Sequence, residues 1–181
     1  LPLQSGSSRV LKAMRRTYTR ERYLDLVDRI RTAIPDISLS TDIIVGFPGE
    51  TEEEFLETVS LCEQVEFDGA YTFIFSPRSG TAAANMEDLP YAVKQERLEH
   101  LIDVVRTISA KRHQRHVGTV QQVLVEGTSR TDATKMRGRT RHNVIVNFAG
   151  DAPVGSLVDV DIVHASSETL LGRQVATAVV H

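Results

Sequence analysis

The chain has 181 residues, 41% of them hydrophobic and 25% charged, which is enough for one domain or two small ones with buried cores. Its 21 lysines and arginines against 24 aspartates and glutamates give a net charge of −3. That balance argues against a histone-like binder but leaves local basic patches open. The single cysteine, Cys62, excludes an internal disulfide and a cysteine-ligated iron–sulfur cluster within this chain. A reducing, cytoplasmic environment is therefore expected.

No apolar run approaches the roughly 18–20 residues that cross a bilayer, so no membrane partner is expected. The chain begins at Leu1 without a basic region followed by an apolar run, which argues against a signal peptide. We expect that the start is a cut inside a longer protein.

Helix-period and strand-period segments alternate over the first two thirds of the chain. The predicted elements are a helix capped by Thr19 and ended by Pro35, a strand over 37–45, a helix opened by a capping box at 51–54, a strand over 70–75 and a long helix after Pro90. This order predicts a parallel sheet, to which residues 1–4 would add a third strand. Because a complete (β/α)₈ barrel needs roughly 250 residues, the segment is at most half of one.

The helical period ends near Gly118. Short β-branched runs follow at 120–126, 142–148, 157–164 and 174–180, separated by turn residues. This spacing predicts a small antiparallel barrel or sandwich. We therefore expect two domains, residues 1–117 and 118–181.

Residues 126–143 carry five lysines and arginines against two acids, a local excess of +3. If 136–141 is a strand, Arg137, Arg139 and Arg141 lie on one face, where guanidinium groups suit phosphate oxygens. A solvated edge strand that discourages aggregation explains the same pattern equally well.

Three loops follow the predicted parallel strands, at residues 4–8, 46–51 and 76–81. Ligands of βα folds bind at the carboxyl ends of strands, so these loops could together hold a polar, partly anionic cofactor. Asp42 lies within an apolar strand and is either a pocket carboxylate or a hydrogen-bonded structural acid. Arg15 and Arg16 either meet a ligand carboxylate or serve solubility.

Two residue types at other positions are expected to be structural. Cys62 shares a helix face with apolar residues and is predicted to lie in the core. The histidines show no zinc-binding spacing, and His113 and His116 are predicted to form an exposed helix end.

Several motifs in combination carry a resemblance to a known family. Residues 1–7 (LPLQSGS), 11–19 (LKAMRRTYT) and 40–51 (STDIIVGFPGET) resemble the middle of radical S-adenosylmethionine methylthiotransferases, and the tail is similar to the RNA-binding TRAM domain that ends them. The implied fold is α/β: the C-terminal part of a radical-SAM (β/α) partial TIM barrel, followed by a small all-β, OB-like TRAM barrel.

Within that family, residues 75–81 (FSPRSGT) and 138–143 (GRTRHN) look like the tRNA-modifying branch. That branch adds a methylthio group to the adenine ring of N(6)-isopentenyladenosine next to the anticodon. The alternatives are the branch that modifies a ribosomal protein and a non-catalytic RNA-binding module.

The resemblance implies S-adenosylmethionine and two [4Fe–4S] clusters as cofactors, with the cluster cysteines outside this chain. The complete protein is then an enzyme, whereas this chain alone is expected to be inactive. A tRNA with a prenylated adenosine and an electron donor are the implied partners.

By motif match, the resemblance also assigns site residues. Those expected at S-adenosylmethionine are Gln4, Ser5, Ser7, Arg16, Asp42, Gly46, Phe75 and Ser76. Those expected to contact tRNA are Arg137, Arg139, Arg141 and Asn143. No catalytic residue and no metal ligand is expected within the chain.

Overall fold

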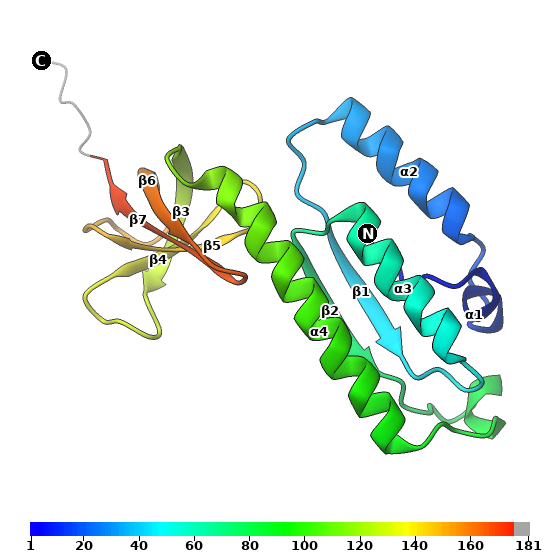
Figure 1. Cartoon of the computed structure of the whole chain (residues 1–181). Helices are drawn as coiled ribbons and strands as arrows, with labels where there is room; N and C mark the ends of the chain where they lie inside the picture. Colours follow the sequence, from blue (N-terminus) through cyan, green and yellow to red (C-terminus); the bar gives the residue numbers. More distant parts are fainter. Residues whose placement is uncertain (176–181) are drawn as a thin grey trace, which may run out of the picture. The chain divides into compact units, whose positions relative to one another are not determined.

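The computed structural model of the chain describes residues 1–175, which form two compact units, Leu1–Ile108 and the unit that starts at Ser109 (Figure 1). The first unit contains α1 (Ser8–Ala13), α2 (Arg20–Ala33), β1 (Ser40–Val45), α3 (Glu52–Val65), β2 (Gly69–Ile74), a 3₁₀ turn (Ala82–Asn85) and most of α4 (Tyr91–His113). The second contains a 3₁₀ turn (Gln114–His116), β3 (Val120–Thr128), β4 (Met136–Thr140), β5 (Ile145–Ala149), β6 (Leu157–Ala165) and β7 (Thr169–Gln174). The sequence-based boundary at 117/118 stays a prediction.

The first unit is built on two parallel strands, with β1 and β2 in register from Ser40 opposite Gly69 to Val45 opposite Ile74. The predicted third strand is a single parallel bridge, in which the Gln4 amide donates to the Asp42 carbonyl at 2.8 Å and the Ile44 amide donates to the Gln4 carbonyl at 2.9 Å. Figure 1 shows α2, α3 and α4 running alongside these strands.

The two faces of β1 have different surroundings. Thr41, Ile43 and Val45 are buried, and the two apolar residues join a core that includes Phe55 and Leu101 from the helices. The alternating residues of β1 are less buried, because they point to the opposite face. That opposite face is the one available to a ligand.

Local signals explain the helices of this unit. Thr19 caps α2 by accepting from the Arg22 amide, and Thr51 and Glu54 form the predicted capping box of α3. Cys62 is fully buried on α3, so its predicted core position is confirmed. The six-residue helix α1 falls where the sequence predicts no helix; it has no side-chain cap and is held by its buried Val10 and Leu11.

The second unit is a closed five-stranded barrel in the order β3-β4-β5-β7-β6, as expected for an OB-like TRAM domain. All pairs are antiparallel except β5 and β7, which run parallel. The last strand lies earlier in the chain than predicted: β7 spans Thr169–Gln174, whereas the sequence predicts a strand over 174–180. Residues 176–180 of that prediction lie outside the described residues.

His113 and His116 are each only 3% exposed, so the predicted exposed helix end is wrong. His113 ends α4 and His116 ends the 3₁₀ turn that follows, and both rings pack against other residues of the second unit. His113 Nδ1 lies 2.8 Å from the Ser166 carbonyl oxygen, and the His116 ring is 5.3 Å from that of His142.

None of the helices in residues 1–175 is long and apolar enough to cross a membrane.

Candidate cofactor cavity and RNA-binding surface

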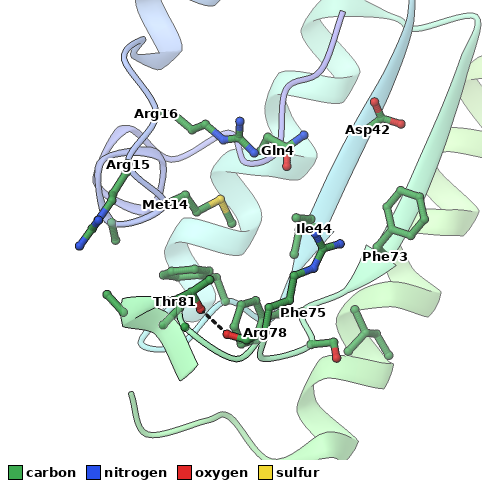
Figure 2. A pocket seen from close by; sticks show the side chains of 17 residues that line it. Gln4, Met14, Arg15, Arg16, Asp42, Ile44, Phe73, Phe75, Arg78 and Thr81 are labelled. Atoms are coloured by element: carbon green, nitrogen blue, oxygen red, sulfur yellow. Dashed lines mark hydrogen bonds between the residues drawn. The ribbon is translucent and has the colours of Figure 1, made fainter. Parts of the chain in front are cut away.

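A cavity of about 820 Å³ opens in the first unit, on the face of the strands that points away from the core (Figure 2). It is lined by Gln4, Ala13, Met14, Arg15, Arg16, Asp42, Ile44, Phe47, Phe73, Ile74, Phe75, Ser76, Arg78, Gly80, Thr81, Ala82 and Ala83. These residues come from the segment at 1–4, from β1 and β2 and from the loops that follow, where the sequence predicts a ligand site.

Five of the eight predicted cofactor residues line this cavity: Gln4, Arg16, Asp42, Phe75 and Ser76. Asp42 alternates with the buried residues of β1 and therefore points into the cavity. No hydrogen bond or ion pair from its side chain occurs within residues 1–175, so the pocket interpretation of this acid is favoured over the structural one.

The other three predicted residues, Ser5, Ser7 and Gly46, are not among those that line the cavity. The Ser5 and Ser7 side chains are buried; the Ser7 amide donates to Ser5 Oγ at 3.2 Å, and Ser7 Oγ donates to Glu54 Oε1 at 3.4 Å. A Cβ on Gly46 would lie 2.4 Å from Lys94 Cγ, so the Lys94 stem closes off that side. In this arrangement these three residues shape the loops; their contact with a cofactor remains a prediction.

Two residues of the cavity wall have a strained backbone. Gln4 and Arg15 both have left-handed backbone conformations, with φ of 67° and 58°, and both line the cavity. Such conformations cost non-glycine residues roughly 1–3 kcal/mol and persist where the surroundings enforce them, often at ligand sites.

A buried ionic network holds the 46–50 loop from the α4 side. Glu50 Oε1 accepts from the Gly46 amide at 3.2 Å and from Arg97 Nη1 at 2.9 Å, and Arg97 also donates to the Glu50 carbonyl at 3.1 Å. Burial raises the pKa of Glu50, while these donors and the charge of Arg97 act against that rise. The network holds Phe47 at the cavity wall. Its ring meets the Phe75 ring edge-on, with 5.2 Å between the ring centroids.

A second network holds the same loop from the side of α1. Arg9 forms a paired contact with both oxygens of Glu54, and it also donates to the Gly49 carbonyl. The hydrogen bond from Arg9 is the main reason that the pKa of Glu54 falls to about 2. Together the two networks fix the loop between β1 and α3.

The arginine side chains that line the cavity, in contrast, have no partner within the described residues. Arg15, Arg16 and Arg78 make no side-chain hydrogen bond or ion pair within the described part of the chain, whereas Arg9 and Arg97 are engaged in the walls. With Asp42 as the opposing acid, the lining carries a net positive charge and suits an anionic or zwitterionic ligand.

The sequence does not assign several of the lining residues to the site. It offers Arg15 only as one of two possible ligand contacts, and Arg78 only as part of a loop. Phe73 could have been found from the sequence, because it lies two residues before the predicted site residue Phe75, within the predicted strand over 70–75, and so shares its face.

The predicted RNA contacts lie on the barrel of the second unit. Arg139 Nε donates to Glu126 Oε1 at 2.9 Å and its Nη1 donates to Asn143 Oδ1 at 3.0 Å, while Arg137 Nη1 is 3.8 Å from Glu126 Oε2. Arg141 lies in the turn just beyond β4, so the three arginines do not share one strand as the spacing suggests. Glu126 offsets part of the local charge, and Arg141 remains exposed to a partner.

Comparison with known proteins identifies both units. The radical SAM superfamily profile matches residues 1–62, and the TRAM domain profile matches residues 114–175. A tRNA-2-methylthio-N(6)-dimethylallyladenosine synthase from Clostridium botulinum (strain Okra) is 52% identical over 177 residues, 97% of this chain and 39% of that protein. The chain therefore contains part of a radical SAM domain followed by a TRAM domain. Proteins of the same name from Geobacillus kaustophilus and Thermoanaerobacter sp. (strain X514) are 54% and 51% identical, over 99% and 97% of the chain.

The chain spans 39%, 34% and 38% of the lengths of these three relatives. All three carry the name of a tRNA-modifying synthase, which favours that branch of the family over the ribosomal-protein branch.

The cavity fits the cofactor of this family. S-adenosylmethionine carries a carboxylate, two cationic centres and an adenine, and the lining offers Arg16, Asp42 and the Phe47 ring for these groups. An iron–sulfur cluster does not fit the described residues: Cys62 is fully buried with its pKa raised to about 12, and residues 1–175 hold no group of three potential metal ligands.

Proposed function

We propose that this chain is part of a tRNA-modifying enzyme that adds a methylthio group to the adenine ring of N(6)-isopentenyladenosine next to the anticodon. The observation that carries the proposal is the cavity at the strand ends, with unpaired Arg16 and Asp42, in a chain 52% identical to a synthase of that name. The whole reaction needs two [4Fe–4S] clusters and an electron donor, whose ligands and site lie outside this chain.

The first unit would contribute part of the S-adenosylmethionine site. Arg16 would pair with the carboxylate of the methionine moiety, and Asp42 would accept hydrogen bonds from its ammonium group. Phe47, held in place by the Glu50–Arg97 network, would pack against the apolar part of the cofactor. When bound, S-adenosylmethionine supplies the radical precursor and the methyl group of this chemistry.

The second unit would bind the tRNA. Arg137, Arg139, Arg141 and Asn143 offer guanidinium and amide donors to phosphate oxygens on the surface of the barrel. With tRNA as its substrate, the protein would work in the cytoplasm.

The test combines gene deletion with mass spectrometry of tRNA nucleosides. Deleting the gene should remove the methylthio group from prenylated adenosine, and the intact gene should restore it. Unchanged methylthioadenosine in the deletion strain contradicts the proposal, and loss of a methylthio group from a ribosomal protein instead supports the other branch.

The role of Arg16 is tested by the variant Arg16→Ala in the same complementation. Losing a hydrogen bond to a charged group should weaken S-adenosylmethionine binding by roughly 10- to 100-fold. The matched control is Arg29→Ala, since Arg29 is an exposed arginine on α2 whose ion pair with Asp25 is a loose 4.0 Å contact.

A further inference from the structure

Two aromatic side chains stand uncovered on β2. Tyr71 is 63% exposed and Phe73 is 51% exposed, although most aromatic rings of the first unit are buried or half-buried. Residues two apart on a strand share a face, and the register pairs Tyr71 with Asp42 and Phe73 with Ile44. The aromatic pair therefore belongs to the same face as the cavity and extends it along the strand.

These rings take no part in the core of the described chain. Neither ring belongs to the core of the first unit or packs at its edge, whereas Ala70 and Ile74, on the other face of β2, do. Within residues 1–175, β2 is also an edge strand, paired only with β1. A pair of exposed rings on an edge strand favours aggregation unless a partner covers it, so a binding role explains it better than packing.

A cation lies at the end of this aromatic stripe. Arg78 follows β2 closely, lines the cavity with Phe73, and makes no side-chain hydrogen bond or ion pair in the described residues. Figure 2 shows its side chain extending from the loop toward Ile44. With Arg15 and Arg16 across the cavity, the charge around the stripe is net positive even though Asp42 lies opposite Tyr71.

Aromatic faces beside guanidinium groups match one ligand chemistry closely. Unpaired nucleobases stack on aromatic side chains with little regard to sequence, and arginine binds the phosphate that follows each base. A peptide strand added to the β2 edge would use the backbone and would leave Arg78 without a counter-charge. Charge complementarity therefore favours a single-stranded nucleic acid.

We infer that Tyr71, Phe73 and Arg78 form a nucleotide subsite, in which unstacked bases of the substrate RNA lie on the two rings and Arg78 holds a phosphate. The inference rests on the proposed function for the RNA substrate and assigns it a place on the first unit. Its residues are distinct from the barrel arginines of the second unit.

The test uses the chain with a short single-stranded RNA that carries 2-aminopurine, whose fluorescence falls when it stacks on an aromatic ring. The wild-type chain should bind and quench the probe. The variants Tyr71→Ala and Phe73→Ala should weaken binding on the order of tenfold each and reduce the quenching. Phe73→Leu keeps apolar bulk for folding but should still reduce the quenching, and Arg78→Ala should weaken binding more than Arg78→Lys.

Matched controls are Leu56→Ala, an exposed apolar residue on α3, and the triple variant Arg137→Ala, Arg139→Ala and Arg141→Ala on the barrel. The triple variant should bind RNA more weakly yet still quench the probe when saturated. Circular dichroism confirms that each variant is folded.

Three results would overturn the subsite. The first is that Phe73→Leu and Tyr71→Ala leave the quenching unchanged, and the second is that the wild-type chain binds no RNA. The third is that sedimentation shows the substitutions only break a dimer. RNA binding that depends on the barrel arginines but not on β2 overturns the subsite and leaves the proposed function intact. If RNA binding depends on β2 but deletion of the gene leaves methylthioadenosine unchanged, the subsite is supported and the proposed function is overturned.

Discussion

Two glutamates only four residues apart have pKa values shifted in opposite directions. Glu50 is 3% exposed, and its burial raises its pKa. Glu54 accepts hydrogen bonds from Arg9, the Thr51 amide and Ser7, which lower its pKa to about 2. The two carboxylates hold opposite ends of the same loop, but only the stabilisation from Glu54 is lost as the pH falls.

The first prediction follows from Glu54. Its folded pKa of about 2 lies below the ordinary 4.5, so its stabilisation is full above pH 4.5 and is lost as the pH falls toward 2. Glu54→Gln should lower the free energy of unfolding by roughly 2 kcal/mol at pH 7. The loss is no larger because more than half of the Arg9 side chain is exposed and solvent screens the pair. Urea unfolding at pH 7 and pH 3 measures this cost.

The difference between wild type and Glu54→Gln should shrink between those two pH values. The raised pKa of Glu50 acts in the opposite sense but is present in both proteins, so it cancels in the comparison. A difference that is the same at both pH values would contradict the assignment.

At the scale of elements, Arg97 on α4 is the main tie to the loop after β1. Arg97→Met removes the cation from a pair whose two side chains are 7% and 2% exposed, leaving Glu50 buried without it. Breaking a buried pair from one side costs roughly 3–5 kcal/mol. Chemical denaturation should show that loss, with faster amide exchange at Gly46, the donor to Glu50.

The double variant Glu50→Gln with Arg97→Met is the decisive control. It removes both charges and should recover part of the lost stability, since no buried charge is then left unpaired. A double variant as unstable as the sum of the single variants would show that the two residues act separately.

The barrel depends on a close approach between β3 and β4. A Cβ on Gly138 would lie 2.3 Å from the Leu124 carbonyl oxygen and 2.5 Å from Val123 Cγ1. Gly138→Ala should therefore destabilise the barrel by about 1–3 kcal/mol in thermal unfolding. Gly69→Ala is the matched control, because a Cβ there meets nothing within 4 Å; equal effects of both would contradict the packing argument.

Local chemistry makes most elements predictable, and long-range pairing sets the limits. Thr19, the capping box at Thr51 and the apolar periods predict α2, α3 and α4 within a few residues. The short α1 has no cap signal and depends on tertiary burial. The parallel pairing of β5 with β7 joins segments more than 20 residues apart, and strand patterns alone do not specify such partners.

The residues of the candidate site are likewise predictable only in part. Strand ends and small-residue loops lead to Gln4 and Ser76, because the fold class fixes where loops meet, and an acid within an apolar strand leads to Asp42. Whether a serine in such a loop faces the cavity or the core depends on side-chain direction. Burial turns Ser5 and Ser7 inward, which spacing does not reveal.

For the whole molecule, the net charge of −3 conceals a basic surface on the barrel that is itself uneven. Arg137 and Arg139 share Glu126, whereas Arg141 has no ion pair in residues 1–175. The three arginines therefore differ in how much charge they offer to RNA.

Salt dependence of RNA binding measures that difference. Arg141→Ala should reduce the slope of log K against log salt by about 0.7 for a single-stranded probe, the value for one phosphate contact. Arg137→Ala should reduce it less, because that arginine is partly neutralised by Glu126. A larger loss of slope in Arg137→Ala than in Arg141→Ala would refute this ranking.

The left-handed backbone of Gln4 and Arg15 has a consequence for engineering this protein. Glycine at either position would relax the backbone by about 1 kcal/mol and make the chain more thermostable. The same change would strip a polar side chain from the cavity wall. Selection for heat resistance and selection for ligand affinity therefore act in opposite directions at these two positions, and a screen on melting temperature alone would favour weaker binders.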